Sequence, residues 1–116
     1  MTAAEYNLRK VEAGTTWQLY MTLKNDSGNV IDLTGYSARM KVRPTADSPT
    51  VLVSLTSGSG ITLGGTFGTI VVDRSATQTA LYRFKSGVYD LEMESGTGVV
   101  TRLLEGVFVV SPEVTR

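Results

Sequence analysis

Apolar and polar residues alternate with a period of two along much of the chain, which is typical of strands with one buried face. In the clearest run, Trp17, Leu19, Met21 and Leu23 lie on one side, and Tyr20 lies among the polar residues on the other. This run predicts a half-buried strand whose inner face includes the tryptophan.

Two later runs alternate in the same way and carry opposite charges on their polar sides. Residues 37–43 present a basic row, and residues 88–94 present an acidic row. Opposite charges stabilise neighbouring strands when they lie across from each other, so we expect a cross-strand ladder on the solvent side. Each exposed pair contributes only about 0–1 kcal/mol, so the ladder would mainly set the register. The basic row is Arg39, Lys41 and Arg43, and the acidic row is Asp90, Glu92 and Glu94.

Helical signals are confined to one short segment. The sequence Ser-Ala-Thr-Gln at residues 75–78 matches a capping box, and it predicts a short helical turn near residues 75–81. A lone glycine, Gly106, interrupts the last apolar run, and we expect a bulge or a bend there.

The spacing of these elements predicts the fold class. Clusters of glycine, serine, asparagine and proline separate about seven to nine short strands, with turns about every 8–12 residues. We therefore expect an all-β protein, an antiparallel Ig-like β-sandwich with one short helical turn. No composition shift divides the chain, so residues 1–116 are expected to form a single β-sandwich domain with short flexible termini.

The C-terminal segment after Pro112 has two interpretations. It contains too little apolar surface to fold alone and would then fray, or it docks on a neighbouring subunit as an extra strand. Together with the two charged rows it makes up the candidate interface. The interface residues are Arg39, Lys41, Arg43, Asp90, Glu92, Glu94, Val114, Thr115 and Arg116.

Composition excludes much chemistry, because the chain has no cysteine and no histidine. Disulfide frameworks, thiolate nucleophiles, Cys/His zinc sites and Ser-His-Asp triads are therefore excluded. The acidic row has successive Cα atoms about 6.5–7 Å apart, which is too wide to share one ion without another strand. We predict no catalytic, cofactor-binding or metal-binding residues and no cofactor.

Charge and hydropathy also limit the expected partners. Lysine and arginine total 11 and aspartate and glutamate total 11, with a pI near 6.2, whereas nucleic-acid-binding domains usually have a pI above about 9. The longest purely apolar run is residues 107–110, against about 20 residues for a membrane helix. No secretory signal pattern begins the chain. We expect neither nucleic acid nor membrane as a partner.

Several segments carry a family resemblance when taken together. The most distinctive is the hexapeptide IDLTGY at residues 31–36, which exceeds what strand patterning requires. The sequence resembles small tailed-bacteriophage structural proteins, including the N-terminal domain of phage baseplate upper proteins. The similar segments, in the same order, are residues 14–17, 23–28, 31–36, 40–43, 70–72, 75–79, 87–92 and 104–110.

The resemblance implies a non-enzymatic structural subunit of a tailed-bacteriophage virion that acts through protein–protein assembly. It would be a baseplate, tail, collar or head-decoration component, made in the host bacterial cytoplasm and incorporated into the virion. Its partners would be other phage virion proteins, with a homo-oligomer as a further expectation. Baseplate relatives usually continue into a fibre or carbohydrate-binding region, and the single sandwich favours a free-standing subunit. Apolar residues that alternation leaves outward would contribute to assembly: Leu52, Val88, Val100 and Phe108.

Two alternatives remain open. A carbohydrate- or host-receptor-binding module would use exposed tyrosines as stacking surfaces, and it requires several of them on one patch. The candidates are Tyr20, Tyr36, Tyr82 and Tyr89. An enzyme using only serine, lysine or carboxylates would require a pocket that brings two such groups within hydrogen-bond reach.

Overall fold

The computed structural model describes residues 4–115, which form nine strands, one α-helix and one 3-10 helix. The expected all-β class is confirmed, and so is the short helical turn near residues 75–81. The elements are β1 (Ala4–Glu5), β2 (Leu8–Glu12), β3 (Trp17–Thr22), β4 (Ser37–Arg43), β5 (Val53–Ser57), β6 (Gly60–Leu63), η1 (Gly65–Phe67), β7 (Thr69–Arg74), α1 (Ala76–Thr79), β8 (Ser86–Glu94) and β9 (Val100–Ser111).

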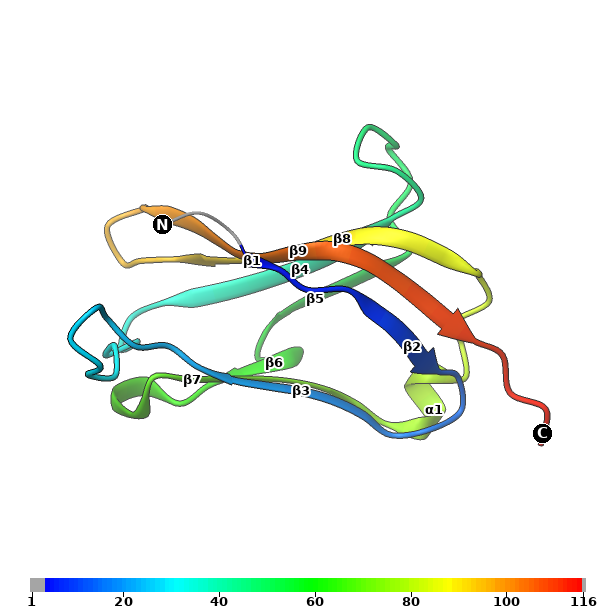
Figure 1. Cartoon of the computed structure of the whole chain (residues 1–116), viewed down its shortest axis with the longest axis horizontal. Helices are drawn as coiled ribbons and strands as arrows, with labels where there is room; N and C mark the ends of the chain where they lie inside the picture. Colours follow the sequence, from blue (N-terminus) through cyan, green and yellow to red (C-terminus); the bar gives the residue numbers. More distant parts are fainter. Residues whose placement is uncertain (1–3, 116) are drawn as a thin grey trace.

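All nine strands belong to one hydrogen-bonded sheet that curls around its own core. The strand order is β1-β9-β8-β4-β5-β6-β7-β3, and β2 also pairs with β9. One layer contains β1, β2, β9, β8 and β4, and the facing layer contains β6, β7 and β3 (Figure 1). The layers are joined where β5 meets β6, through the pairs Thr56–Gly60 and Ser57–Ile61. The sheet therefore encloses apolar side chains from both layers.

The expectation of a wholly antiparallel arrangement is wrong at two places. β1 and β2 both run parallel to β9, with Ala4 opposite Leu104 and Leu8 opposite Phe108; the short β5–β6 pairing is also parallel. The β5–β6 pairing spans only two residue pairs across the turn at residues 58–59, whereas parallel pairing along whole strands normally requires a long connection. β1 and β2 meet this condition because almost the whole chain separates them from β9.

The core is centred on an aromatic residue that alternation had placed outside. Phe108 is fully buried, and the Trp17 ring packs edge-on against it with centroids 5.7 Å apart. The reason is a bulge: Leu91 pairs with Leu104 but Glu92 pairs with Arg102, so β9 has one extra residue there. An extra residue reverses the inward and outward positions that follow it. Val100, before the bulge, is exposed as expected, and Leu52 packs partly against the core.

Gly106 does not interrupt the strand, because β9 continues through it. A Cβ atom at this position would lie 2.5 Å from the Tyr6 carbonyl oxygen and 2.7 Å from Asn7 Oδ1. The glycine therefore allows the segment between β1 and β2 to pass close to β9. That segment is held by the Tyr89 hydroxyl, which donates to the Tyr6 carbonyl, and by Val107 N–H, which donates to Asn7 Oδ1 at 3.0 Å.

The helix α1 begins with the predicted capping box. Gln78 N–H donates to Ser75 Oγ at 3.2 Å, and Ser75 N–H donates to Gln78 Oε1 at 2.9 Å. Thr79 is fully buried at its end, where its hydroxyl accepts from Gly14 N–H and donates to the Thr15 carbonyl. The helix is thereby tied to the turn between β2 and β3. Within residues 4–115, no helix is long and apolar enough to cross a membrane.

Candidate functional site

The two charged rows lie side by side on the outer face of the sheet. β4 and β8 are antiparallel neighbours, with Arg39 opposite Glu92 and Lys41 opposite Asp90. Their alternate residues, including Met40 and Leu91, are buried in the core. Because one face of β4 and β8 is buried in the core, the basic row and the acidic row both lie on the opposite, outer face. We call this surface the charged face: Arg39, Lys41, Arg43, Asp90, Glu92, Glu94, Arg102 and Glu105.

The predicted cross-strand ladder is confirmed for Arg39. Its Nε lies 3.1 Å from Glu92 Oε1, and its Nη1 lies 3.0 Å from Glu94 Oε1. Hydrogen bonds to Glu94 and then to Glu92 raise the pKa of the Arg39 guanidinium. One arginine therefore bridges two carboxylates on the neighbouring strand and fixes their position.

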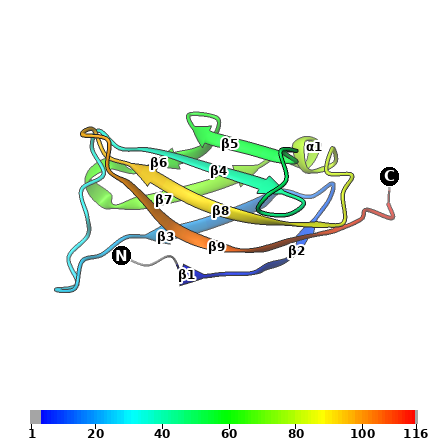
Figure 2. The ribbon, with the colours of Figure 1, turned by 90° about the horizontal axis from the view of Figure 1, so that it is seen from above.

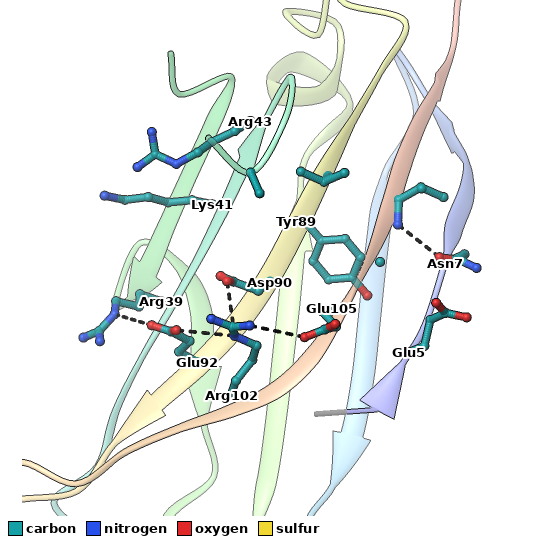
Figure 3. Close-up of a pocket in the computed structure, with 14 residues that line it drawn as sticks. Glu5, Asn7, Arg39, Lys41, Arg43, Tyr89, Asp90, Glu92, Arg102 and Glu105 are labelled. Atoms are coloured by element: carbon teal, nitrogen blue, oxygen red, sulfur yellow. Dashed lines mark hydrogen bonds and ion pairs between the residues drawn. The ribbon is translucent and has the colours of Figure 1, made fainter. Parts of the chain in front are cut away.

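Arg102 on β9 is a second bridging arginine, and the sequence analysis missed it. Its guanidinium lies 3.5 Å from Asp90, 3.7 Å from Glu92 and 3.3 Å from Glu105. Figure 3 shows it at the centre of these three carboxylates. The signal available was the alternation of Arg102 with Thr101 and Leu103, but the neighbouring strand could not be known from that pattern.

The carboxylates of the charged face lie close together, and, in addition to burial, this proximity contributes to a raised pKa at Asp90. Partial burial raises the pKa of its side chain, and the nearby charge of Glu92 raises it further, while Arg102 acts in the opposite direction. Four carboxylates thus share two arginines: Asp90, Glu92, Glu94 and Glu105 are held by Arg39 and Arg102.

Lys41 and Arg43 differ from the other two cations of the face. Within residues 4–115, neither forms an ion pair with a carboxylate, and Arg43 instead donates to the Ser48 carbonyl at 3.0 Å. Both side chains extend away from the carboxylate cluster (Figure 3). They form one wall of a groove of about 620 Å³, whose opposite side is lined by Glu5 and Asn7. Within the part of the chain that the structure describes, Lys41 and Arg43 thus form no ion pair with the carboxylates that line the rest of the groove.

The C-terminal part of the candidate interface lies elsewhere. Val114 is 89% exposed and Thr115 is exposed, in the segment that follows the end of β9 (Figure 1). Neither residue lines the groove. Arg116 lies outside the described residues.

Among residues 4–115, no group of three or more aspartates or glutamates is placed to hold a metal ion. Among the described residues, the groove is lined by arginines, one lysine, carboxylates, an asparagine, a tyrosine, a glycine and apolar residues, and by no serine or threonine.

The four candidate stacking tyrosines do not form one exposed patch. Tyr89 is 4% exposed and lies in β8, with burial raising its pKa to about 12, whereas Tyr20 is 61% exposed and lies in β3. Tyr36 and Tyr82 pack partly against the core from two different loops. A stacking surface requires adjacent exposed rings, so their positions argue against a carbohydrate-binding patch.

No protein-family model matches the chain, and no curated protein matches it.

Proposed function

We propose that this protein is a non-enzymatic structural subunit of a tailed-bacteriophage virion, in the baseplate, tail, collar or head decoration. It reaches the virion after synthesis in the host bacterial cytoplasm. The resemblance of the sequence to such proteins motivates this proposal. Its function is to bind neighbouring virion proteins, and a homo-oligomer is compatible with the same role.

The observation that carries the proposal is the uneven charge of the charged face. Its carboxylates are already engaged by Arg39 and Arg102, whereas Lys41 and Arg43 have no carboxylate partner within the described residues. Charges arranged in this way favour a partner with acidic groups and select its orientation more than they add affinity. The partner surface would therefore place carboxylates against Lys41 and Arg43.

We further propose that the curled sheet is a variant of the Ig-like sandwich. Support comes from the strand order, with β2, β9, β8, β4 and β5 adjacent in one run and β6, β7 and β3 in the other. Ig-like domains divide their strands between two sheets in a comparable order. The β5–β6 pairing, which joins the runs, is the departure from two separate sheets.

Mass spectrometry of purified virions tests the function directly, and electron microscopy of the same particles locates the subunit. The double variant Lys41→Glu, Arg43→Glu should fold normally by circular dichroism but be depleted from particles at least tenfold. A matched control, Lys10→Glu with Arg83→Glu, makes the same charge change at exposed positions outside the charged face. Virions that lack the protein, or that incorporate both double variants equally well, would contradict the proposal.

A further inference from the structure

One edge of the sheet presents backbone groups without a strand partner. Among the described residues, β3 pairs only with β7 and ends the strand order. Leu23 N–H donates toward β7, to the Gly68 carbonyl at 2.8 Å. Backbone groups of successive residues in a strand point to opposite sides. Those of Gln18, Tyr20 and Thr22 therefore point away from β7, toward the free edge.

The free edge of β3 lacks the usual protection against pairing. Natural sheets protect free edges with charged residues, proline or bulges. β3 has the sequence WQLYMT, with no charge and no proline, and it pairs with β7 without a break in register. At the other end of the sheet, β2 carries exposed Arg9, Lys10 and Glu12. The β2 edge thus carries charges that oppose pairing and the β3 edge does not, as expected if only β3 accepts another strand.

The inner side of β3 is also incompletely covered. Trp17, Leu19 and Met21 face the core but are only half-buried, whereas Ile70 and Val72 on the neighbouring strand are fully buried. An added strand beside β3 would cover this row with its own apolar side chains. Burial of apolar area is favourable at about 25 cal/mol per Å². The added strand would therefore be stabilised by apolar burial as well as by backbone hydrogen bonds.

The strands near the free edge of β3 limit what can pair with it. In the view from above, β1 and β2 lie beyond β3 on the outer side of the molecule (Figure 2). The sheet of a second copy, brought edge to edge with β3, would meet these overhanging strands. A single extended segment requires only the space of one strand, about 4.8 Å across.

We propose that the free edge of β3 binds one extended, uncharged segment of a neighbouring virion protein as an added strand. The segment pairs with the backbone of Gln18, Tyr20 and Thr22, and its apolar residues lie beside Trp17, Leu19 and Met21. Such β-strand addition obtains affinity from main-chain hydrogen bonds and specificity from alternate side chains. The identity of the partner as a virion protein rests on the proposed function, whereas the strand-binding edge does not.

The test uses the full chain and a short capped peptide of alternating threonine and valine as the probe. Hydrogen exchange measured by NMR should show the amides of Gln18, Tyr20 and Thr22 slowed at least tenfold by the peptide. Fluorescence of Trp17, the single tryptophan, should shift to shorter wavelength as its ring becomes covered. The absence of protection at millimolar peptide would overturn the proposal.

Two variants at one position separate backbone pairing from side-chain contact. Tyr20→Pro removes the outward N–H, and proline is tolerated where the N–H of an edge strand faces solvent. It should keep the circular dichroism spectrum and lose peptide binding, whereas Tyr20→Thr keeps the N–H and should still bind. Equal binding by both variants would contradict the proposal, and if Tyr20→Pro unfolds, the exchange measurement on the unaltered chain decides.

Sedimentation equilibrium without peptide tests whether a second copy of the chain pairs with β3 instead. A concentration-dependent dimer that Tyr20→Pro abolishes would mean that a second copy pairs with β3, and the single-segment proposal would be wrong. A monomer at all concentrations supports it. These measurements do not involve Lys41, Arg43 or virions, so their failure is distinguishable from failure of the proposed function.

Discussion

At the scale of single residues, the core depends on a few aromatic contacts. Trp17 packs on Phe108, which also contacts the rings of Tyr82, Phe84 and Tyr89. The rings of Trp17, Tyr82 and Tyr89 meet Phe108 edge to face, an arrangement that adds about 0.5–1.5 kcal/mol beyond the area it buries. The centre of the molecule is therefore sensitive to loss of any one of these rings.

Trp17→Ala should lower the free energy of unfolding by about 2–3 kcal/mol, below the value for a fully buried tryptophan because the side chain is half-buried. Urea denaturation measures the change. Tyr20→Ala, on the outer side of the same strand, is the control and should cost less than about 0.5 kcal/mol. Equal losses would show that the inward and outward assignments in β3 are wrong.

Gly106→Ala should destabilise the protein by about 1–3 kcal/mol, because its Cβ would press on the backbone oxygen of Tyr6. Thermal denaturation provides the measurement. Gly96→Ala is a suitable control, since the nearest atom to its Cβ, apart from its chain neighbours, would be the Gly35 carbonyl oxygen at 3.6 Å, an ordinary van der Waals distance. A similar cost for both substitutions would mean that the approach of Tyr6 to β9 is not tight.

Tyr89 should give the protein a marked sensitivity to alkaline pH. Burial raises its pKa from 10.0 to about 12, so the folded state favours the neutral phenol. Its stabilising contribution is complete below pH 10 and is lost as the pH rises toward about 12. Tyr89→Phe should cost about 1 kcal/mol at neutral pH, through loss of the hydrogen bond to Tyr6, yet decline less steeply between pH 10 and 12. Parallel declines in urea denaturation would refute this assignment.

At the scale of elements, the charged face shows how strand pairing changes the behaviour of ionisable groups. Asp90 has a raised pKa because partial burial and Glu92 outweigh Arg102. A carboxyl whose pKa is raised by folding stabilises the folded state below its ordinary pKa of 3.8, and this contribution is lost as the pH rises through the raised value. At neutral pH the charged Asp90 therefore opposes folding slightly.

Asp90→Asn should accordingly be more stable than the unaltered protein at pH 7, by only a few tenths of a kcal/mol because the side chain is partly exposed. Urea denaturation at pH 7 and pH 3 should show the advantage shrinking at the lower pH. A variant that is less stable at pH 7 would indicate that the ion pair with Arg102 outweighs burial.

Sequence alternation predicted the elements better than their partners. The rows of β4 and β8 were predicted because each burial pattern is local to one strand, and the capping box of α1 is local as well. A bulge or bend was expected at Gly106, but the bulge of β9 lies at Leu103, which is an extra residue only relative to the partner strand β8. The same limit explains why Arg102 was missed and why Phe108 was placed outside: both assignments require knowledge of a neighbouring strand.

At the scale of the whole molecule, equal numbers of positive and negative residues conceal a local imbalance. The charged face joins a carboxylate cluster held by two arginines to the pair Lys41 and Arg43, which lacks such partners among the described residues. Net neutrality keeps long-range attraction weak, so recognition would act at close range.

Binding through Lys41 and Arg43 should weaken with ionic strength, because exposed charges are screened over about 10 Å at 0.1 M salt and about 3 Å at 1 M. Under the proposed function, purified virions washed at increasing salt should release this protein progressively, and gel electrophoresis of the released fraction measures the loss. Release that is independent of salt would assign attachment to apolar contacts instead.

The parallel pairing of β1 and β2 with β9 has a consequence for biosynthesis. β1 and β2 are synthesised well before β9, the strand with which they pair, so this edge of the sheet cannot form until β9 has been made. Pairings between distant parts of a chain close slowly, and unpaired strands are prone to association while they wait. The exposed charges of β2 would then keep nascent chains apart during this interval, before they become part of the finished sheet.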